Sequence, residues 1–252
     1  MNELHKMTGN QIQQSSFDKV ILAVGSCENH GCHLPHGTDT FVSYKLAKKI
    51  ADQVEGLLVL PPITVGYSQH YAHFPFTINI SCETLTFVLK DILHSVIKNG
   101  IKKIFIMNGH DGNIAPIEIA TRSIKTEFKD VKIASLDAWW VTAGKLLPPD
   151  TFEVWNGLGH AGEGETSISL ALFEEFTEME HARGVVPNNL SDNVDIKWLF
   201  AEITDCGATG DPTKATKEKG LKMVEVLVQA VVQFIKDMDA CDWKYNSTQS
   251  AL

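Results

Sequence analysis

The first stretch of the chain that could carry out chemistry lies between residues 28 and 39. Two carboxylates and three imidazoles fall within it, in the order Glu28-Asn29-His30-Gly31-Cys32-His33-Leu34-Pro35-His36-Gly37-Thr38-Asp39. Carboxylate oxygen and neutral imidazole nitrogen are ligands that Zn, Mn and Fe(II) prefer, and a carboxylate can bridge two such ions. In an extended Glu28-x-His30, both side chains leave the same side of the backbone. The pattern predicts metal ligands here, with a polar loop whose side chains only cap backbone groups as the alternative.

A second candidate segment is Asn108-Gly109-His110-Asp111-Gly112-Asn113, which follows an apolar run and precedes a helical pattern. A histidine at the end of a strand, flanked by glycines that let the backbone turn sharply, is typical of a metal ligand. The alternative is a tight turn followed by a helix cap. The position of His110 opposite the first segment favours the metal ligand.

A third segment, His160-Ala161-Gly162-Glu163-Gly164-Glu165-Thr166-Ser167, opens a helical pattern. Glu165 could complete the shell of a second metal ion, while His160 could carry a proton between an attacking water and a leaving nitrogen. For Glu163 we favour the plainer interpretation that its charge complements the positive end of the helix dipole.

Aromatic and polar side chains in two further segments are candidates for contacting a substrate. Trp139 and Trp140 follow a strand and could form a wall for a flat ring, although at least one of them is expected in the core. Tyr67 and His70 lie in a loop that could reach the substrate or could equally well lie on the surface.

The elements that must position these residues alternate between strands and helices. Lys19 to Val24 is a nearly continuous apolar run, which is typical of a strand buried on both faces of a parallel sheet. Apolar spacing and turn residues predict further strands over residues 57–60, 103–107 and 131–136, and helices over residues 40–54, 81–100, 114–128, 165–175 and 216–235. Residues 185–212 show little regular pattern, and we expect a loose tail over residues 246–252.

Such alternation indicates right-handed βαβ units around a parallel sheet. Ligands bind outside the carboxyl ends of the strands of such a sheet. The segments that follow strands, Glu28 to Asp39, Asn108 to Asn113 and Asp137 to Trp140, are therefore expected to meet at one edge and to share a site.

Composition narrows the class of protein. The chain has 252 residues, 44% of them hydrophobic, which we interpret as one domain over residues 1–252. A formal charge of -9 without a basic run argues against nucleic acid or an anionic membrane as a partner. The chain lacks an apolar run long enough to span a bilayer, and Met1 to Ser16 does not have the pattern of a secretory signal. Five cysteines without a paired spacing indicate reduced thiols in a cytoplasmic protein.

Together, these motifs resemble the creatininase (creatinine amidohydrolase) family. The likeness covers most of residues 20–171, and its motifs keep the order of the family. They are Glu28-x-His30-Gly31-x-His33-Leu34-Pro35-x-Gly37-Thr38-Asp39, Gly66-Tyr67-Ser68-x-His70 with Phe74-Pro75, Asn108-Gly109-His110-x-Gly112-Asn113, and His160-Ala161-Gly162-x-x-Glu165-Thr166-Ser167. Gly207 to Pro212 is also similar to the loop before the last helix of the family.

The resemblance implies a layered α/β/α fold with a mainly parallel central sheet, two divalent metal ions (Zn, Mn or Fe(II)), and hydrolysis of a C–N bond other than an ordinary peptide bond. It also implies a homohexamer that acts on a small molecule. By motif position, Glu28 and His110 would hold one metal, His30 the other, and Asp39 would bridge them. His160 falls where the family has its proton-handling histidine.

Two departures concern the substrate. Creatininases proper carry a Glu two residues after the motif histidine, where this chain has Gly112, so Glu165 or a water would have to complete the second metal shell. Relatives often have Gly after the Phe-Pro pair, where this chain has Phe76. Both changes argue against creatinine as the substrate. Relatives with the Gly-containing motif include a formamide-cleaving deformylase and a peptide-trimming hydrolase.

Two other classes of function remain open from the residues. One is a metal-dependent lyase, isomerase or hydrolase that acts on a sugar-like carbonyl compound. The other is a non-catalytic subunit that keeps metal ions for stability alone, a role that would leave His160 without a task.

Overall fold

The protein is built around a small parallel sheet. The computed structural model describes residues 2–187 and 196–244. The strands are β1 (Lys19–Val24), β2 (Leu57–Val59), β3 (Lys103–Asn108) and β4 (Lys132–Leu136). They lie in the order β2-β1-β3-β4, and every neighbouring pair is parallel. Val20 of β1 pairs with Leu58 on one side and with Ile104 on the other, so β1 and β3 occupy the centre of the sheet.

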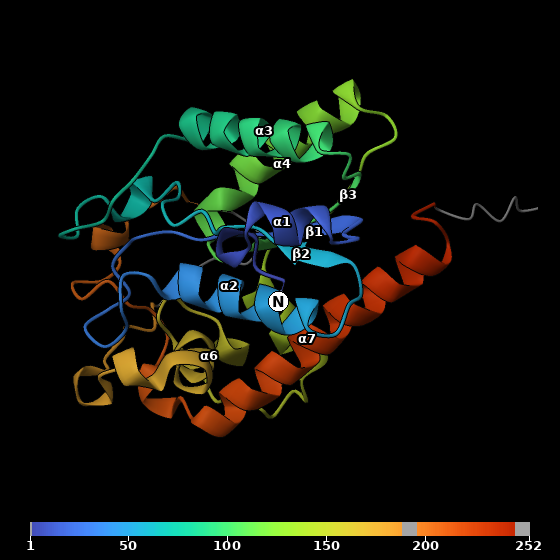
Figure 1. The fold of residues 1–252 in the computed structure, drawn as a ribbon. Helices are drawn as coiled ribbons and strands as arrows, with labels where there is room; N and C mark the ends of the chain where they lie inside the picture. The colour runs from blue at the N-terminus through green and yellow to red at the C-terminus, as the bar shows by residue number, and fades with distance from the viewer. Residues whose placement is uncertain (1, 188–195, 245–252) are drawn as a thin grey trace, which may run out of the picture.

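Helices cover both faces of the sheet and make three layers (Figure 1). The helices are α1 (Gly9–Gln13), α2 (Thr38–Ala51), α3 (Cys82–Lys98), α4 (Ile114–Glu127), α5 (Trp139–Leu146), α6 (Glu163–Phe173) and α7 (Lys217–Ala240). Helices α3 and α4 pack on one face, and α2, α6 and α7 pack on the other. The predicted α/β class with three α/β/α layers and a mainly parallel sheet is confirmed.

The alternation of side chains along β1 explains why both faces need a cover. Ile21 and Ala23 belong to the apolar cluster beneath α2 and α7, whereas Val20, Leu22 and Val24 belong to the cluster beneath α3 and α4. Successive side chains of a strand point to opposite faces, so a continuous apolar run requires two apolar layers. The continuous apolar run of β1 therefore requires helices on both faces of the sheet.

The ends of several elements differ from the sequence-based expectation. Helix α2 begins at Thr38, before the expected residue 40, and α7 continues to Ala240, beyond the expected residue 235. Helix α6 begins at Glu163, so the glutamates of the third motif lie in its first turn. The segment expected as a loop after β4 instead begins a helix, α5, at Trp139. The expected tail over residues 246–252 lies outside the described residues.

The N-terminal segment is attached to α2 by a polar contact. The Glu3 carboxylate accepts a hydrogen bond of 2.6 Å from the Tyr44 hydroxyl, and Lys6 and Lys48 lie 3.0 and 3.3 Å from its oxygens. These charges stabilise the ionised carboxylate. Burial alone would raise the pKa of Glu3, but these partners lower it to about 2.

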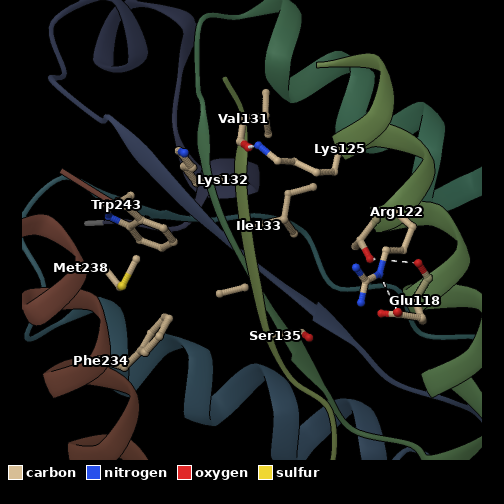
Figure 2. A pocket seen from close by; sticks show the side chains of 12 residues that line it. Glu118, Arg122, Lys125, Val131, Lys132, Ile133, Ser135, Phe234, Met238 and Trp243 are labelled. Carbon is tan, nitrogen blue, oxygen red and sulfur yellow. Dashed lines mark hydrogen bonds and ion pairs between the residues drawn. The ribbon is translucent and has the colours of Figure 1, made fainter. Parts of the chain in front are cut away.

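Strand β4 forms one edge of the sheet and borders a hollow between α4 and α7 (Figure 2). The hollow encloses about 480 Å³, with Ile133 and Ser135 of β4 on its floor and Phe234, Met238 and Trp243 on one wall. None of the motif residues discussed above lines it. Within residues 2–187 and 196–244, no helix is both long and apolar enough to cross a bilayer.

Candidate metal centre

The candidate ligands converge at the carboxyl end of the sheet. Glu28 and His30 lie in the loop after β1, and His110 follows β3 directly. Asp39 is in the first turn of α2, and Glu165 is in the first turn of α6. All five side chains are buried, although they come from segments that are far apart along the chain. The expected meeting of Glu28, His30, Asp39 and His110 at one edge is thus present in the structure.

One group of potential ligands consists of Glu28, Asp39 and His110. The Nδ1 atom of His110 lies 3.1 Å from Glu28 Oε1 and 3.2 Å from Asp39 Oδ2. Their ligand atoms all lie within 4.8 Å of one another, close enough to share one cation. Two carboxylates and one imidazole are a donor set typical of divalent zinc, manganese or iron.

A second group consists of His30, Asp39 and Glu165. The Nε2 atom of His30 lies 3.0 Å from Asp39 Oδ1 and 3.9 Å from Glu165 Oε1. Asp39 therefore directs one oxygen toward each group. A carboxylate in that arrangement can bridge two cations, and a hydrogen bond of 2.5 Å from the Ser26 hydroxyl to Oδ2 holds it in place.

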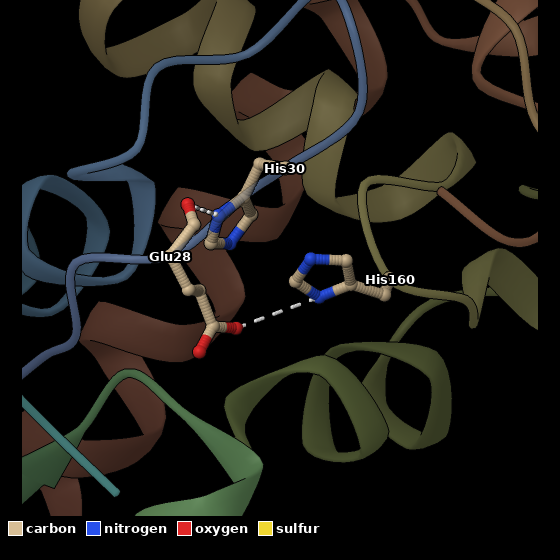
Figure 3. A group of neighbouring side chains, drawn as sticks. All are labelled: Glu28, His30 and His160. Atoms are coloured by element: carbon tan, nitrogen blue, oxygen red, sulfur yellow. Dashed lines mark hydrogen bonds and ion pairs between the residues drawn. The ribbon is translucent and has the colours of Figure 1, made fainter. Parts of the chain in front are cut away.

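His160 faces Glu28 and His30, one member of each group (Figure 3). Its Nδ1 atom lies 3.9 Å from Glu28 Oε1 and 3.9 Å from Glu165 Oε2. Its ring packs at 4.3 Å, centroid to centroid, from the ring of His30. His160, Glu28 and His30 also form a third set of ligand atoms close enough to hold an ion.

Main-chain carbonyls determine which nitrogen of each ring faces the centre. The His30 Nδ1 atom lies 3.1 Å from the carbonyl of Glu28, His110 Nε2 lies 3.1 Å from that of Tyr67, and His160 Nε2 lies 2.7 Å from that of Asn29. A carbonyl oxygen can only accept a hydrogen bond, so each of these nitrogens must carry a proton. In the neutral rings the other nitrogen, which faces the carboxylates, is then free to bind a cation or a proton.

Two glycines allow the backbone to pack tightly around His110. A Cβ atom at Gly109 would lie 2.2 Å from the carbonyl oxygen of Asp39. At Gly112 it would lie 2.1 Å from the carbonyl oxygen of Tyr67, the same oxygen that accepts the His110 proton. In this chain, a side chain at position 112 would therefore displace the group that orients His110.

The charges of the centre shift several pKa values. Burial disfavours charge on His30, but Asp39 and Glu165 outweigh burial and raise the pKa of His30 to about 10. Burial is the main reason that the pKa of Glu165 rises to about 7. Burial also lowers the pKa of His160, and the nearby His30 lowers it further, to about 3. His160 is therefore uncharged at neutral pH in this environment.

The buried environment of the Glu28 carboxylate favours a bound cation. Both oxygens of Glu28 are fully buried and meet no donor with hydrogen-bond geometry among the described residues, although His110 Nδ1 lies 3.1 Å from Oε1. A buried carboxylate without donors is strongly disfavoured unless a cation is bound to it. Metal binding would displace the extra protons that the carboxylates induce on His30 and His110.

Of the predicted substrate-contacting residues, some lie beside the centre and others lie in the core. The ring of His70 stacks on that of His110 at 5.6 Å, so it lies beside the centre. Tyr67 packs against the cluster beneath α3 and α4 and contributes its carbonyl, rather than its ring, to the centre. Trp139 is fully buried, and Trp140 packs against the same cluster beneath α2 and α7. The expectation that at least one of the two tryptophans belongs to the core is met by Trp139, and a contact between Trp140 and a substrate stays a prediction.

The aromatic rings beside His160 are Tyr71 and Phe200, which sequence reasoning did not identify. The Tyr71 ring lies 4.3 Å from those of both His160 and Phe200, and Phe200 lies 5.2 Å from His160. Tyr71 is adjacent to His70, so the second motif gave a signal for it. Phe200 lies in a segment without apolar periodicity and offered none.

Glu163 is a structural anchor rather than a partner of the helix dipole alone. Its fully buried carboxylate accepts hydrogen bonds from the main-chain N–H groups of Glu153 and Val154 and from Lys219 of α7. These contacts attach the first turn of α6 to the preceding loop and to the last helix. Glu163 therefore supports the segment that carries His160 without reaching the centre.

Comparison with known proteins agrees with this geometry. Creatinine amidohydrolase of Pseudomonas putida is 27% identical over 232 residues, which are 86% of this chain and 88% of that protein. A 3-dehydro-scyllo-inosose hydrolase of Thermotoga maritima is 30% identical over 92% of this chain and 82% of that protein. A solved structure described as "Creatininase Mn" superposes with a TM-score of 0.79 at 26% identity and covers 94% of this chain and 98% of that one.

The family model described as "Creatininase: Creatinine amidohydrolase" matches residues 5–235. The match spans the sheet, both candidate ligand groups and His160. The chain therefore belongs to the creatininase family.

Proposed function

We propose that this protein is a metal-dependent amidohydrolase that cleaves a C–N bond, other than an ordinary peptide bond, in a small molecule. The observation that carries the proposal is the pair of buried ligand groups that share Asp39. The family match supports the hydrolytic class, and the burial of the ligands supports a site that excludes bulk water.

Two divalent ions would be held by residues from three parts of the fold. Glu28 and His110 would bind one ion, His30 and Glu165 the other, and Asp39 would contact both. Glu165 would thus supply the second carboxylate that Gly112 cannot. When bound, such a pair of ions supplies a hydroxide near neutral pH and polarises the substrate carbonyl. Zn, Mn and Fe(II) all suit the oxygen and nitrogen donors.

His160 would move the proton during the reaction. Its Nε2 proton is committed to the Asn29 carbonyl, so Nδ1 is the atom that can accept a proton from water. Nδ1 faces Glu28 and Glu165, where the reacting atoms would lie. Once protonated, the same atom can donate that proton to the leaving nitrogen. We therefore assign His160 as the general acid and base, with Glu165 as its neighbour at the second ion.

The surroundings of His160 suit a small and flat substrate. Tyr71, Phe200 and His70 form an aromatic side to the centre, and such side chains bind planar groups through their faces. Cyclic amides and formamides are planar at the bond to be cleaved. Gly112, where creatininases proper have Glu, argues against creatinine itself.

Hydrolysis of a cyclic, sugar-like carbonyl compound is the second candidate. It is favoured by the relative from Thermotoga maritima, whose name describes a hydrolase of an inosose derivative. The two candidates differ in their products, because only C–N hydrolysis releases an amine. Both would incorporate oxygen from water, which a lyase or an isomerase would not.

The test begins with protein from which metals have been removed and to which Mn, Zn or Fe(II) is returned. Cyclic amides, formamides, short peptides and cyclic ketones would be screened in heavy-oxygen water with mass spectrometry of the products. We expect activity to rise with about two metal equivalents per chain and a labelled product that includes a free amine. Full activity in protein shown to contain no divalent metal would overturn the proposal.

A matched pair of variants separates the centre from general effects of charge. Glu28→Gln removes a buried ligand, whereas Glu225→Gln removes the charge of an exposed glutamate on α7. Only the first variant should lose metal and activity. Equal metal content in both would contradict the assignment of Glu28.

The proposal also covers the oligomeric state of the protein and its location in the cell. We infer a homohexamer, from the resemblance to the family, and a cytoplasmic location, supported by the five cysteines, all of which are free. Sedimentation of the purified protein would measure the assembly. A monomer at micromolar concentration would contradict the first inference.

A further inference from the structure

The residue that follows His160 has an unfavourable backbone conformation. Ala161 has a φ of 51°, in the left-handed region that favours glycine, and its side chain is fully buried. A non-glycine residue stays in this region only when its surroundings hold it there, and such residues cluster at functional sites. The contacts that hold Ala161 therefore also determine where His160 lies.

Both polar groups of Ala161 are bound by side chains of α6. Its N–H donates to Glu165 Oε2 at 2.6 Å, and its carbonyl accepts from the Thr166 hydroxyl at 3.1 Å. The neighbouring His160 is fixed on its other side, since its N–H donates to the Thr209 hydroxyl and its carbonyl accepts from the Thr209 N–H. Thr166 thus holds the Ala161 carbonyl directly through its hydroxyl.

A buried histidine completes the arrangement at Thr166. The hydroxyl proton of Thr166 is used for the Ala161 carbonyl, so its oxygen is an acceptor for His33, whose Nε2 atom lies 2.9 Å away. His33 must therefore carry its proton on Nε2. Its Nδ1 atom is buried and has no hydrogen-bond partner among the described residues, so the ring makes its side-chain hydrogen bond at Nε2 alone.

We propose that Thr166 and His33 are positioning residues that hold the strained Ala161 peptide and thereby aim His160 Nδ1 at the metal centre. The inference rests on the proposed function for its catalytic consequence. Neither side chain belongs to the ligand groups, so the effect acts through the main chain. A hydroxyl is needed at position 166, because it must both donate to the carbonyl and accept from the imidazole.

The principal test replaces Thr166 by Val, which keeps the shape of the side chain but removes both hydrogen bonds. We expect Thr166→Val to lower kcat about 10- to 100-fold, since a small misplacement of a catalytic group has costs of this order. KM and metal content should change less than about twofold, because the ligand groups are intact. Thr166→Ser restores the hydroxyl and should recover most of the activity.

A second pair of variants tests the histidine. His33→Leu removes the Nε2 proton and should reproduce the fall in kcat, while His33→Gln offers an N–H group and should retain part of the activity. Thr86→Val is the matched control, because Thr86 is a buried threonine of α3 whose hydroxyl donates only to the carbonyl of Cys82. It should leave kcat unchanged.

A crystal structure of Thr166→Val makes the test independent of activity. We expect the Ala161 peptide to leave the left-handed region or the His160 Nδ1 atom to move away from Glu28, relative to the 3.9 Å separation described here. An unchanged His160 position with unchanged kcat would overturn the inference. Loss of metal in both Thr166→Val and Thr166→Ser would also overturn it. If the wild-type protein proves inactive on every substrate, the proposed function fails, but the displaced ring would still support the positioning role.

Discussion

Glu165 illustrates how the environment assigns a task to a single side chain. Its two carboxylate oxygens face different partners, Oε1 toward His30 and Oε2 toward the Ala161 N–H and His160. One residue therefore contributes to the ion site and to the loop that carries the proposed proton carrier. Substitutions at this position should affect both.

Glu165→Gln tests the first of these tasks. The amide keeps the size of the side chain but is a poor ligand for a divalent ion, so we expect metal content to fall from about two ions per chain to about one. Elemental analysis of the dialysed protein measures this directly. Two retained ions would show that Glu165 is not a ligand.

His160→Gln tests the proton carrier. Loss of a general acid typically costs about 100- to 10,000-fold in rate, and we expect a fall in kcat of this size with both ions retained. Steady-state kinetics together with metal analysis distinguish the alternatives, because His160 is also close enough to Glu28 and His30 to bind an ion. A variant that loses metal in proportion to activity would be a ligand variant.

Residue types and spacing were sufficient to predict the convergence of Glu28, His30, Asp39 and His110, because parallel strands bring their carboxyl ends to one edge. They were not sufficient for the aromatic surroundings. Trp139 and Trp140 have the composition of a binding wall, yet burial of α5 against the core places Trp139 out of reach. Tyr71 and Phe200 instead lie beside His160, through contacts that only the folded chain defines.

At the scale of elements, α6 is held at its first turn by a buried charge. The Glu163 carboxylate has no exposed surface and binds two main-chain N–H groups and Lys219 of α7. The helix dipole, which the sequence suggested as its partner, adds to these contacts but cannot account for the burial. The position of the whole segment from His160 to Thr166 depends on this anchor.

Glu163→Gln should therefore destabilise the protein by about 2 to 4 kcal/mol, because it replaces a paired, buried carboxylate and leaves Lys219 without its closest partner. Glu174→Gln breaks a more exposed pair with Lys217 and should cost far less, because solvent screens such a pair. Urea unfolding of the two variants measures the contrast. Equal losses would show that Glu163 acts as a surface charge.

The elements themselves were predictable where one apolar period dominated. Lys19 to Val24 and the helix over Cys82 to Lys98 match the expectation closely, since both have long, regular apolar patterns. Helix α5 was missed because Asp137 to Trp140 follows a strand, where a site loop was expected. Its helical conformation arises from packing against α7 rather than from a strong local signal.

At the scale of the whole molecule, the candidate ligands come from the loop after β1, the ends of α2 and β3, and α6. Such a site exists only when the sheet and both helical layers are assembled. Ions should therefore bind the folded chain in strong preference to the unfolded one. Removing them with a chelator should lower the Tm by several degrees, measured by calorimetry. An unchanged Tm in protein shown to be metal-free would contradict this coupling.

The contact between Glu3 and α2 makes the stability of the folded protein depend on pH. The pKa of Glu3 is lowered from 4.5 to about 2. The stability that its ionised carboxylate contributes to the folded protein is therefore fully present above about pH 4.5 and is lost as the pH falls toward 2. Because Glu3 is near the surface, we expect Glu3→Gln to cost only about 1 kcal/mol at neutral pH, and nothing at the acid end of this range. Glu55→Gln, at an exposed position, is the control. A loss that does not change with pH would contradict the role of the Glu3 charge.

The hydrogen bonds from the three histidine rings to main-chain carbonyls have a consequence for sequence divergence. The acceptors belong to Glu28, Asn29 and Tyr67, but none of them is a side-chain atom. A mutation that exchanges the phenol of Tyr67 for another side chain leaves the tautomer of His110 unchanged, provided that the local backbone path is kept. Divergence of the side chain at position 67 is thus compatible with an unchanged ligand geometry at His110.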